Sequence, residues 1–317
     1  MEQKLIVSSS PHIRDEGSVT KVMTDVVIAL LPATIGAVYF FRTNALVLIL
    51  IAVITAVLAE AAVQKIRKQP VTIKDMSAVV TGLLIALNIT AASPWWLPMI
   101  GSAFAIVVVK QLFGGLGKNF MNPALAARIL LTLSWTGRMT EWVNPGPDMI
   151  SAATPLSFVK GQMAVPANAP SLFDTFVGSI GGCMGETSAV LLLLGGLYLL
   201  YRGVIKVTIP AVYVGTVALI ILVYSGFDVE FMLYHVVAGG LLIGAIFMAT
   251  DYSSSPVTDK GKVIFALGCG ILTATIRLFG GFNEGVGFSI LLMNVATPLI
   301  DRYSVPTIYG EVKKQNA

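Results

Sequence analysis

Apolar stretches long enough to cross a lipid bilayer recur along almost the whole of this 317-residue chain, and they constrain its fold more than any other feature. Hydrophobic residues make up 56% of the sequence and charged residues only 12%. A soluble protein would carry about 25% charged residues to cover its surface, so lipid must cover this one. The sequence therefore predicts an all-α polytopic integral membrane protein.

About ten segments meet the requirement of roughly 20 mainly apolar residues for a spanning helix. The fifth segment begins with Asn122 and Pro123, and the tenth contains Asn294 and Pro298. We therefore predict that these two are broken or half-buried helices shielded by their neighbours. The ten segments are residues 22–41, 45–63, 77–92, 95–112, 121–135, 187–201, 207–225, 234–250, 262–278 and 286–300.

Basic residues predict the orientation, because cytoplasmic loops of membrane proteins are enriched in Lys and Arg. With the N-terminus in the cytoplasm, 16 of the 21 basic residues fall on the inner side, Arg42, Arg138, Lys160 and Arg277 fall outside, and Arg128 lies within the fifth segment. We therefore expect a multi-pass membrane protein with both termini in the cytoplasm. The net charge of +4 is a topology signal and indicates no nucleic-acid partner.

The chain also resembles itself, because VVTGLLIALNITAASP at 79–94 recurs loosely at 236–256, and LFGG at 112–115 returns at 278–281. Near-equal offsets in the same order indicate two homologous halves, and five helices per half would invert the second copy. We predict a cytoplasmic N-terminal segment (1–21), a first five-helix repeat (22–135), an extracytoplasmic loop (136–186), a second five-helix repeat (187–303) and a cytoplasmic tail (304–317).

The predicted long loop, residues 136–186, contains the stretch DMISAATPLSF. Pro155 favours an extended backbone at Thr154, and Ala152 and Ala153 leave the threonine hydroxyl sterically open. On these features alone, the stretch is most simply a connecting turn.

DMISAATPL resembles the Asp-x-x-Ser-Gly/Ala-Ala-Thr signature at which a flavin transferase links the phosphate of FMN to a threonine hydroxyl. SPHIRDEGSV, GGLGKNFMNPALAARI and GFNEGVGFSILLMNVATPLIDRY extend the resemblance over nearly the whole chain. Together they are similar to the family of the D subunit of the Rnf electron transport complex and the B subunit of the sodium-translocating NADH:quinone reductase. The resemblance implies covalent FMN on Thr154. The recognition motif would comprise Asp148, Ser151, Ala152 (where glycine is frequent), Ala153 and Pro155.

The resemblance implies a membrane electron-transfer subunit of a ferredoxin:NAD oxidoreductase complex that couples electron flow to sodium or proton translocation, in a bacterial or archaeal cytoplasmic membrane. Its implied partners are the flavin transferase and the other membrane and cytoplasmic subunits, including a second flavoprotein and iron–sulfur subunits. Inverted repeats with broken helices also build secondary transporters, so a transporter or channel without redox activity is the alternative. The flavin motif favours the redox subunit, because a transporter has no need of a modified external threonine.

Polar residues in the fifth and tenth segments are candidates for binding, because ionisable and amide groups inside a membrane are costly. Arg128 follows Asn122 closely and is predicted to hold an anionic flavin, a carboxylate or backbone carbonyls. Asn122 and Asn294 are further candidate cofactor-binding residues. With Asn119 and Thr297 they could line a cavity for an ion or a second flavin, and the resemblance leaves noncovalent riboflavin open.

Other candidates have simpler explanations. Asp25, Glu60 and Lys110 lie near the ends of predicted helices, where an interfacial or snorkelling position accounts for a charge. Cys183 and Cys269 are isolated thiols with no CxxC motif or partner histidine, so neither an iron–sulfur cluster nor a structural zinc is expected in this chain. No catalytic residue or metal ligand is predicted.

Overall fold

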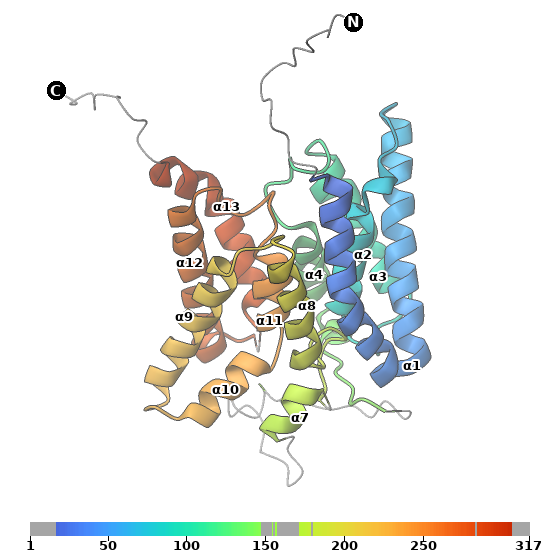
Figure 1. The fold of residues 1–317 in the computed structure, drawn as a ribbon. Coiled ribbons are helices and arrows are strands. Elements are labelled where there is room, and N and C mark those ends of the chain that lie inside the picture. Colours follow the sequence, from blue (N-terminus) through green and yellow to red (C-terminus); the bar gives the residue numbers. More distant parts are fainter. Residues whose placement is uncertain are drawn as a thin grey trace, which may run out of the picture.

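The computed structural model describes residues 17–146, 154, 156, 171–178, 180–282 and 284–305, and the regular elements of this part of the chain are helices packed into one bundle (Figure 1). In chain order they are α1 (Val19–Ile66), η1 (Ile73–Asp75), α2 (Ser77–Leu87), α3 (Trp96–Phe104), η2 (Ala105–Gln111), α4 (Pro123–Ser134), α5 (Thr136–Met139), α7 (Leu172–Val177), α8 (Ala189–Tyr201), α9 (Thr208–Tyr224), α10 (Val229–Val237), α11 (Leu241–Ile243), η3 (Gly244–Met248), α12 (Asp259–Phe279) and α13 (Val286–Ser304).

α1 is a hairpin of two helices. Its 48 residues would form a rod of about 70 Å at 1.5 Å per residue, which is more than twice the hydrocarbon thickness of a bilayer. The backbone leaves helical geometry at Arg42, where φ is 54° and ψ is −135°, and the two arms lie side by side (Figure 1). The arms correspond to the spans predicted at 22–41 and 45–63.

Fewer described helices are full spans than the sequence predicts. By length and composition, α1 and α12 can cross a membrane, and α10 with Leu241–Met248 forms a pair bent by 60° that can serve as a third span. The other apolar helices have 10–17 residues. They are short because polar turns stop them inside the bundle, as at Asn88 after α2 and Asn122 before α4. The predicted fold class, an all-helical membrane protein, is therefore confirmed. The predicted number of ten full spans is not confirmed.

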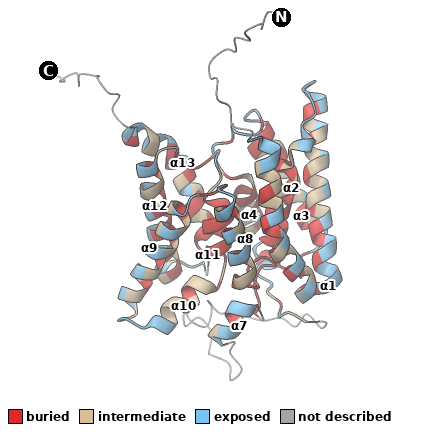
Figure 2. Cartoon of the chain, viewed as in Figure 1, coloured by how far each residue is buried: buried red, intermediate tan, exposed pale blue. Residues whose placement is uncertain are grey.

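The core lies where the helices face one another, and exposed residues lie on the outer faces (Figure 2). Many of these exposed residues are large and apolar, including Ile35, Leu58, Leu219 and Leu299. Inside the bundle, small residues let backbones approach closely, and Gly195 lies so near Ala29 O that no side chain fits. An apolar outer surface around close-packed helices is the pattern that lipid requires.

α2 and η3 meet in the interior. α2 follows the arm of α1 that returns to the side where the described chain begins, whereas η3 follows α10 from the opposite side (Figure 1). Asn88 Nδ2 lies 3.9 Å from Met248 Sδ, and Asn122 Nδ2 donates to Met248 O at 3.3 Å. Two short elements that enter from opposite sides therefore end beside the start of α4.

The tenth predicted segment is half-buried and unbroken. α13 runs through Pro298 as one helix of 19 residues, with Asn294 and Thr297 buried. Proline removes one backbone donor from a helix. Contacts to a neighbouring loop hold the helix at this point, because Thr297 Oγ1 donates to Ser254 O at 3.0 Å. Of the two predicted forms, a broken helix or a half-buried one, α13 is the half-buried helix.

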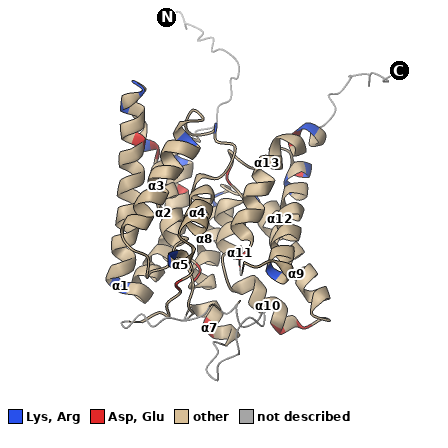
Figure 3. Cartoon of the chain, turned by 180° about the vertical axis from the view of Figure 1, so that it is seen from behind, with Lys and Arg blue, Asp and Glu red and all other residues tan. Residues whose placement is uncertain are grey.

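α7 lies at the side opposite to that where α1 begins and α13 ends (Figure 1). Lys and Arg gather mainly at the latter side (Figure 3). A capping box defines the start of α7, since Ser171 and Asp174 exchange hydrogen bonds between side chain and backbone. Hydrogen bonds from Ser171 also hold the pKa of the Asp174 carboxyl below its usual range. The arrangement matches the predicted topology in placing both ends of the described bundle on one side.

Cysteine labelling of intact cells is expected to establish which side is outside. Phe173 on α7 is 72% exposed and Tyr303 on α13 is 84% exposed, whereas the native Cys183 and Cys269 are buried. A membrane-impermeant maleimide should label Phe173→Cys in intact cells and Tyr303→Cys only after permeabilisation. The unsubstituted chain, as control, should stay unlabelled. The reverse pattern would invert the predicted topology.

Candidate functional site

A buried ionic cluster surrounds Arg128 on α4. Arg128 Nη1 donates to Asn88 Oδ1 at 2.7 Å, and Nη2 donates to Glu186 Oε1 at 3.2 Å and to Glu284. Cys183 Sγ lies 3.4 Å from the same Nη2. Arg128 was predicted to hold an anionic flavin, a carboxylate or backbone carbonyls. In the structure it holds two carboxylates, those of Glu186 and Glu284.

Local sequence places Arg128 at the centre of this cluster. Asn122 caps α4, since its Oδ1 accepts from Ala124 N at 3.0 Å and Leu125 N at 3.3 Å, and Pro123 occupies the first helical position, where its missing N–H costs nothing. The helix thus begins inside the bundle. Arg128 follows within two turns and meets the groups that end α2 and precede α8.

Glu186 reaches the cluster because its loop pairs with the chain around the end of α2. Gly185 N donates to Leu87 O at 2.7 Å, and Met184 N donates to Ile89 O at 3.0 Å. A side chain on Gly185 would come within 2.8 Å of Leu87 Cβ, so glycine is needed for this approach. The loop that the sequence places outside the membrane therefore returns to the interior.

Leu156, two residues after the predicted flavin threonine, packs beside the cluster. Thr154 is 7% exposed, and Leu156, two residues further on, is 3% exposed. A Cβ on Gly239, which follows α10, would lie 2.6 Å from both Leu156 Cδ1 and Glu284 Oε1, and 3.1 Å from Arg277 Nη2. The segment after Thr154 therefore packs at the corner between α10 and α11, beside two charged side chains.

The expectation of a sterically open hydroxyl was wrong for the folded chain, since Thr154 is buried. The other motif residues, Asp148, Ser151, Ala152, Ala153 and Pro155, lie outside the described residues.

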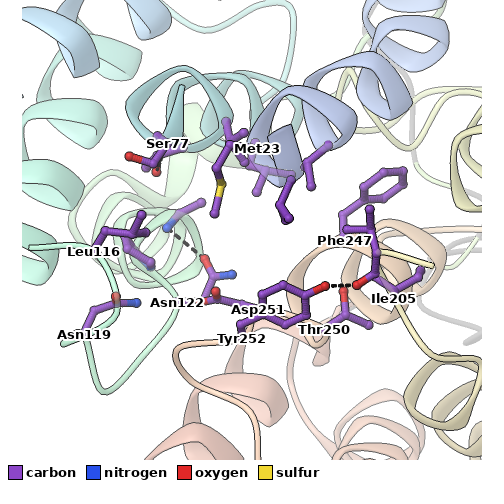
Figure 4. A pocket seen from close by; sticks show the side chains of 18 of the residues that line it. Met23, Ser77, Leu116, Asn119, Asn122, Ile205, Phe247, Thr250, Asp251 and Tyr252 are labelled. Carbon is purple, nitrogen blue, oxygen red and sulfur yellow. Dashed lines mark hydrogen bonds between the residues drawn. The ribbon is translucent and has the colours of Figure 1, made fainter. Parts of the chain in front are cut away.

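A second candidate site is a cavity between α1, α2, α4, α8 and the end of η3, on the side where α1 begins. Figure 4 shows Asn119 and Asn122 on its lower wall, with Met23 and Ser77 across from them. Asp251 lines the same cavity and accepts a hydrogen bond from Ser254 Oγ at 3.0 Å. Most of the remaining lining is apolar, including Val26, Leu84, Leu199 and Phe247.

Asn122 and Asn294, the two predicted amide residues, lie next to each other, but only Asn122 lines the cavity. With its amide oriented to satisfy both neighbours, Asn294 accepts from Asn122 N at 3.1 Å and donates to Ser254 O at 3.2 Å. Asn294 and Thr297 are absent from the cavity lining, whereas Asn119 and Asn122 belong to it. Of the four residues predicted to line one cavity, only Asn119 and Asn122 do so, and Asn294 instead supports Asn122 from behind. Arg128, a separate candidate, lies in the ionic cluster.

Lys110 and Glu60 do not snorkel. They are 2% and 1% exposed and form an ion pair at 2.8 Å. Lys110 Nζ also donates to Ser77 Oγ at 2.6 Å, and Gln111 Nε2 donates to Glu60 Oε1 at 2.8 Å. Asp25 is likewise paired, with Arg202 Nε 3.2 Å away. The interfacial explanation is therefore wrong for Glu60 and Lys110, which neutralise each other inside the bundle.

Sequence reasoning missed Glu186 and Glu284, because both lie just outside the predicted apolar segments, where a charged residue is ordinary. The signal that could have found them is an adjacent glycine, which precedes Glu186 in GGCMGE and follows Glu284 in GFNEG. Glycine next to a lone acid permits a close backbone approach into a packed interior.

These features define the class of the protein: an all-helical membrane protein with an ionic cluster towards one side and an amide-lined cavity towards the other. A family model described as the NQR2, RnfD, RnfE family matches residues 6–310. The chain belongs to this family.

Three relatives show how close the similarity is. The D subunit of the Na(+)-translocating ferredoxin:NAD(+) oxidoreductase complex of Acetobacterium woodii is 51% identical over 315 residues, covering 98% of this chain and 97% of its own. The D subunit of the proton-translocating ferredoxin:NAD(+) oxidoreductase complex of Clostridium ljungdahlii is 44% identical over 96% of each chain. The D subunit of an ion-translocating oxidoreductase complex of Halorhodospira halophila is 35% identical over 96% of this chain and 95% of its own.

Proposed function

We propose that this chain is the membrane electron-transfer subunit of an Rnf-type ferredoxin:NAD oxidoreductase complex and that Thr154 carries covalent FMN. Full-length similarity to complex subunits named for this activity supports the assignment. The observation that carries it is the packing of Leu156, two residues after the threonine of the flavin motif, at a corner lined by Arg277 and Glu284. The partners are the other subunits of the complex and the flavin transferase.

The bound flavin would supply one- and two-electron redox chemistry, and the protein's part is to fix its position and electrostatic environment. Attachment forms a bond between Thr154 Oγ1 and phosphorus, with loss of one water relative to free FMN. Because Thr154 is buried in the folded chain, we infer that the transferase acts before Leu156 packs against the corner at Gly239. Flavin fluorescence of the denatured subunit in a gel tests the assignment.

The cavity near the start of α1 is the place we propose for a second, noncovalent flavin such as riboflavin. Small-molecule sites typically combine apolar walls with a few polar groups. Here the walls include Val26 and Phe247, and the polar groups include Asn119, Asn122 and Asp251. The mixture suits a planar ring system with a polar edge.

Contacts join the two proposed flavin sites across the bundle. Arg128 holds Asn88, Asn88 touches Met248, and Asn122 at the cavity wall donates to Met248 O. A site near each side of the membrane protein is what an electron-transfer subunit requires, and these contacts hold the two sites in a fixed relation.

Asn122→Leu is expected to lower retention of the noncovalent flavin about tenfold, because it removes the amide from the cavity wall. Covalent flavin on Thr154 should be unchanged, and ferredoxin-driven NAD reduction should slow. Asn122→Ser is the matched control for the helix, since serine also caps α4. Flavin released by denaturation, measured per folded chain, is the readout. Equal retention in wild type and Asn122→Leu would move the second flavin elsewhere.

The alternative is a secondary transporter or channel without redox activity. The observation in its favour is the meeting of α2 and η3, since broken helices that enter from opposite sides also build transporter sites. The same observation supports the proposed inverted five-helix repeats at 22–135 and 187–303. The two functions combine if the subunit couples electron flow to ion movement. The relatives' names include both sodium and proton translocation, so either ion is a candidate.

A further inference from the structure

Arg277, in the last turn of α12, is a buried cation with one unused edge. It is 1% exposed, and its Nη1 donates to His235 O. Its Nε and Nη2 are buried, and no atom of the described residues accepts a hydrogen bond from either. These two nitrogens direct their N–H bonds in parallel from the same edge of the guanidinium, which is the arrangement that binds a pair of anionic oxygens.

The nearby carboxylates are already engaged. Glu284 accepts from Arg128 Nη2 and from Gly240 N, and Glu186 also pairs with Arg128. A buried charge without a hydrogen-bonded counterion is strongly unfavourable. The edge of Arg277 therefore fits an anion that the described side chains do not supply.

The position of this edge identifies the anion. Arg277 Nη2 would lie 3.1 Å from a Cβ at Gly239, and Leu156 Cδ1 would lie 2.6 Å from the same point. Gly239 has φ +76°, a conformation that other residues rarely adopt, and the absence of a side chain there lets Leu156, Glu284 and Arg277 approach one another closely. Thr154 precedes Leu156 by two residues. A phosphate on Thr154 would thus be carried by the segment that packs beside Arg277.

We propose that Arg277 is a positioning residue that binds the phosphate of the flavin attached to Thr154 through its Nε and Nη2. This inference rests on the proposed flavinylation. An ester between threonine and FMN keeps one negative charge shared by two non-bridging oxygens, which match the two parallel donors. The contact neutralises Arg277 and fixes the flavin chain at the corner between α10 and α11.

The test is a double-mutant cycle between the phosphate and the guanidinium, read as the melting temperature of the detergent-purified full chain. Intact mass first establishes the FMN content of each sample. In the loaded wild-type background, Arg277→Gln should lower the melting temperature by about 4 °C, because a charge-assisted pair is lost. In the flavin-free Thr154→Ala background the same change should leave it unchanged or raise it, because an unpaired buried charge is removed.

Controls separate this contact from general destabilisation. Arg138→Gln, at an exposed basic residue on the same side, should have the same effect in both backgrounds. If the Arg277→Gln chain stays unloaded or fails to accumulate, Arg277→Lys supplies the comparison, since it keeps the charge without the paired donors. Equal shifts for Arg277 variants in both backgrounds, with FMN on Thr154, would overturn the contact alone. Absence of FMN from wild-type Thr154 would overturn the proposed function as well.

Discussion

Thr154→Ala is expected to abolish covalent flavin and ferredoxin-driven NAD reduction while leaving the helical bundle assembled. Alanine removes the hydroxyl that forms the bond to phosphorus, so the denatured chain should lose flavin fluorescence and the mass of one FMN less water. Removing one small polar side chain from a packed segment costs only about 1–2 kcal/mol in stability. Loss of cofactor can therefore be separated from loss of fold by size-exclusion chromatography and by recovery of the complex.

Thr154→Ser provides the control for the hydroxyl itself. Serine keeps the oxygen and lacks the methyl group, so partial labelling is expected, with turnover in proportion to the flavin content. A Thr154→Ala chain that still carries covalent flavin would place the attachment elsewhere. A flavin-free chain with full turnover would remove this flavin from the electron path.

The helices were predictable because their signals are local. Apolar runs mark them, and the Asn122-Pro123 pair marks the start of α4 within the bundle, as the capping hydrogen bonds show. Helix lengths were less predictable. A segment such as 77–92 is mainly apolar, yet α2 ends at Leu87, before the polar turn at Asn88, and the chain there accepts hydrogen bonds from the loop at Met184 and Gly185.

The partners of the charged residues could not be predicted, because they are distant in sequence. Lys110 meets Glu60 across 50 positions, and Arg128 meets Glu284 across 156. A helix-end position suggested snorkelling for Lys110, whereas burial between α1, α2 and η2 made pairing necessary. Likewise, small neighbours suggested an open hydroxyl at Thr154, and only the folded structure shows that this residue is buried.

The two carboxylates on Arg128 give that residue the largest expected contribution to stability among the charged groups. Arg128→Gln leaves Glu186 and Glu284 close together with Arg277 as the remaining nearby cation. Removing one partner of a buried ion pair typically costs about 3–5 kcal/mol, because an uncompensated charge remains in a medium of low dielectric constant. We therefore expect a large fall in the denaturation midpoint of the purified subunit and a low yield in the membrane.

Combining Arg128→Gln with Glu284→Gln removes one charge of each sign from the cluster. This double variant should recover more than half of the lost stability, because the remaining Glu186 and Arg277 balance each other in charge. Arg202→Gln is the matched control: its pair with Asp25 is partly exposed, so about 1 kcal/mol or less is expected. If Arg128→Gln proves no more destabilising than Arg202→Gln, the cluster does not depend on Arg128 for charge balance. The carboxyl groups of Glu186 and Glu284 would then be neutralised by protonation.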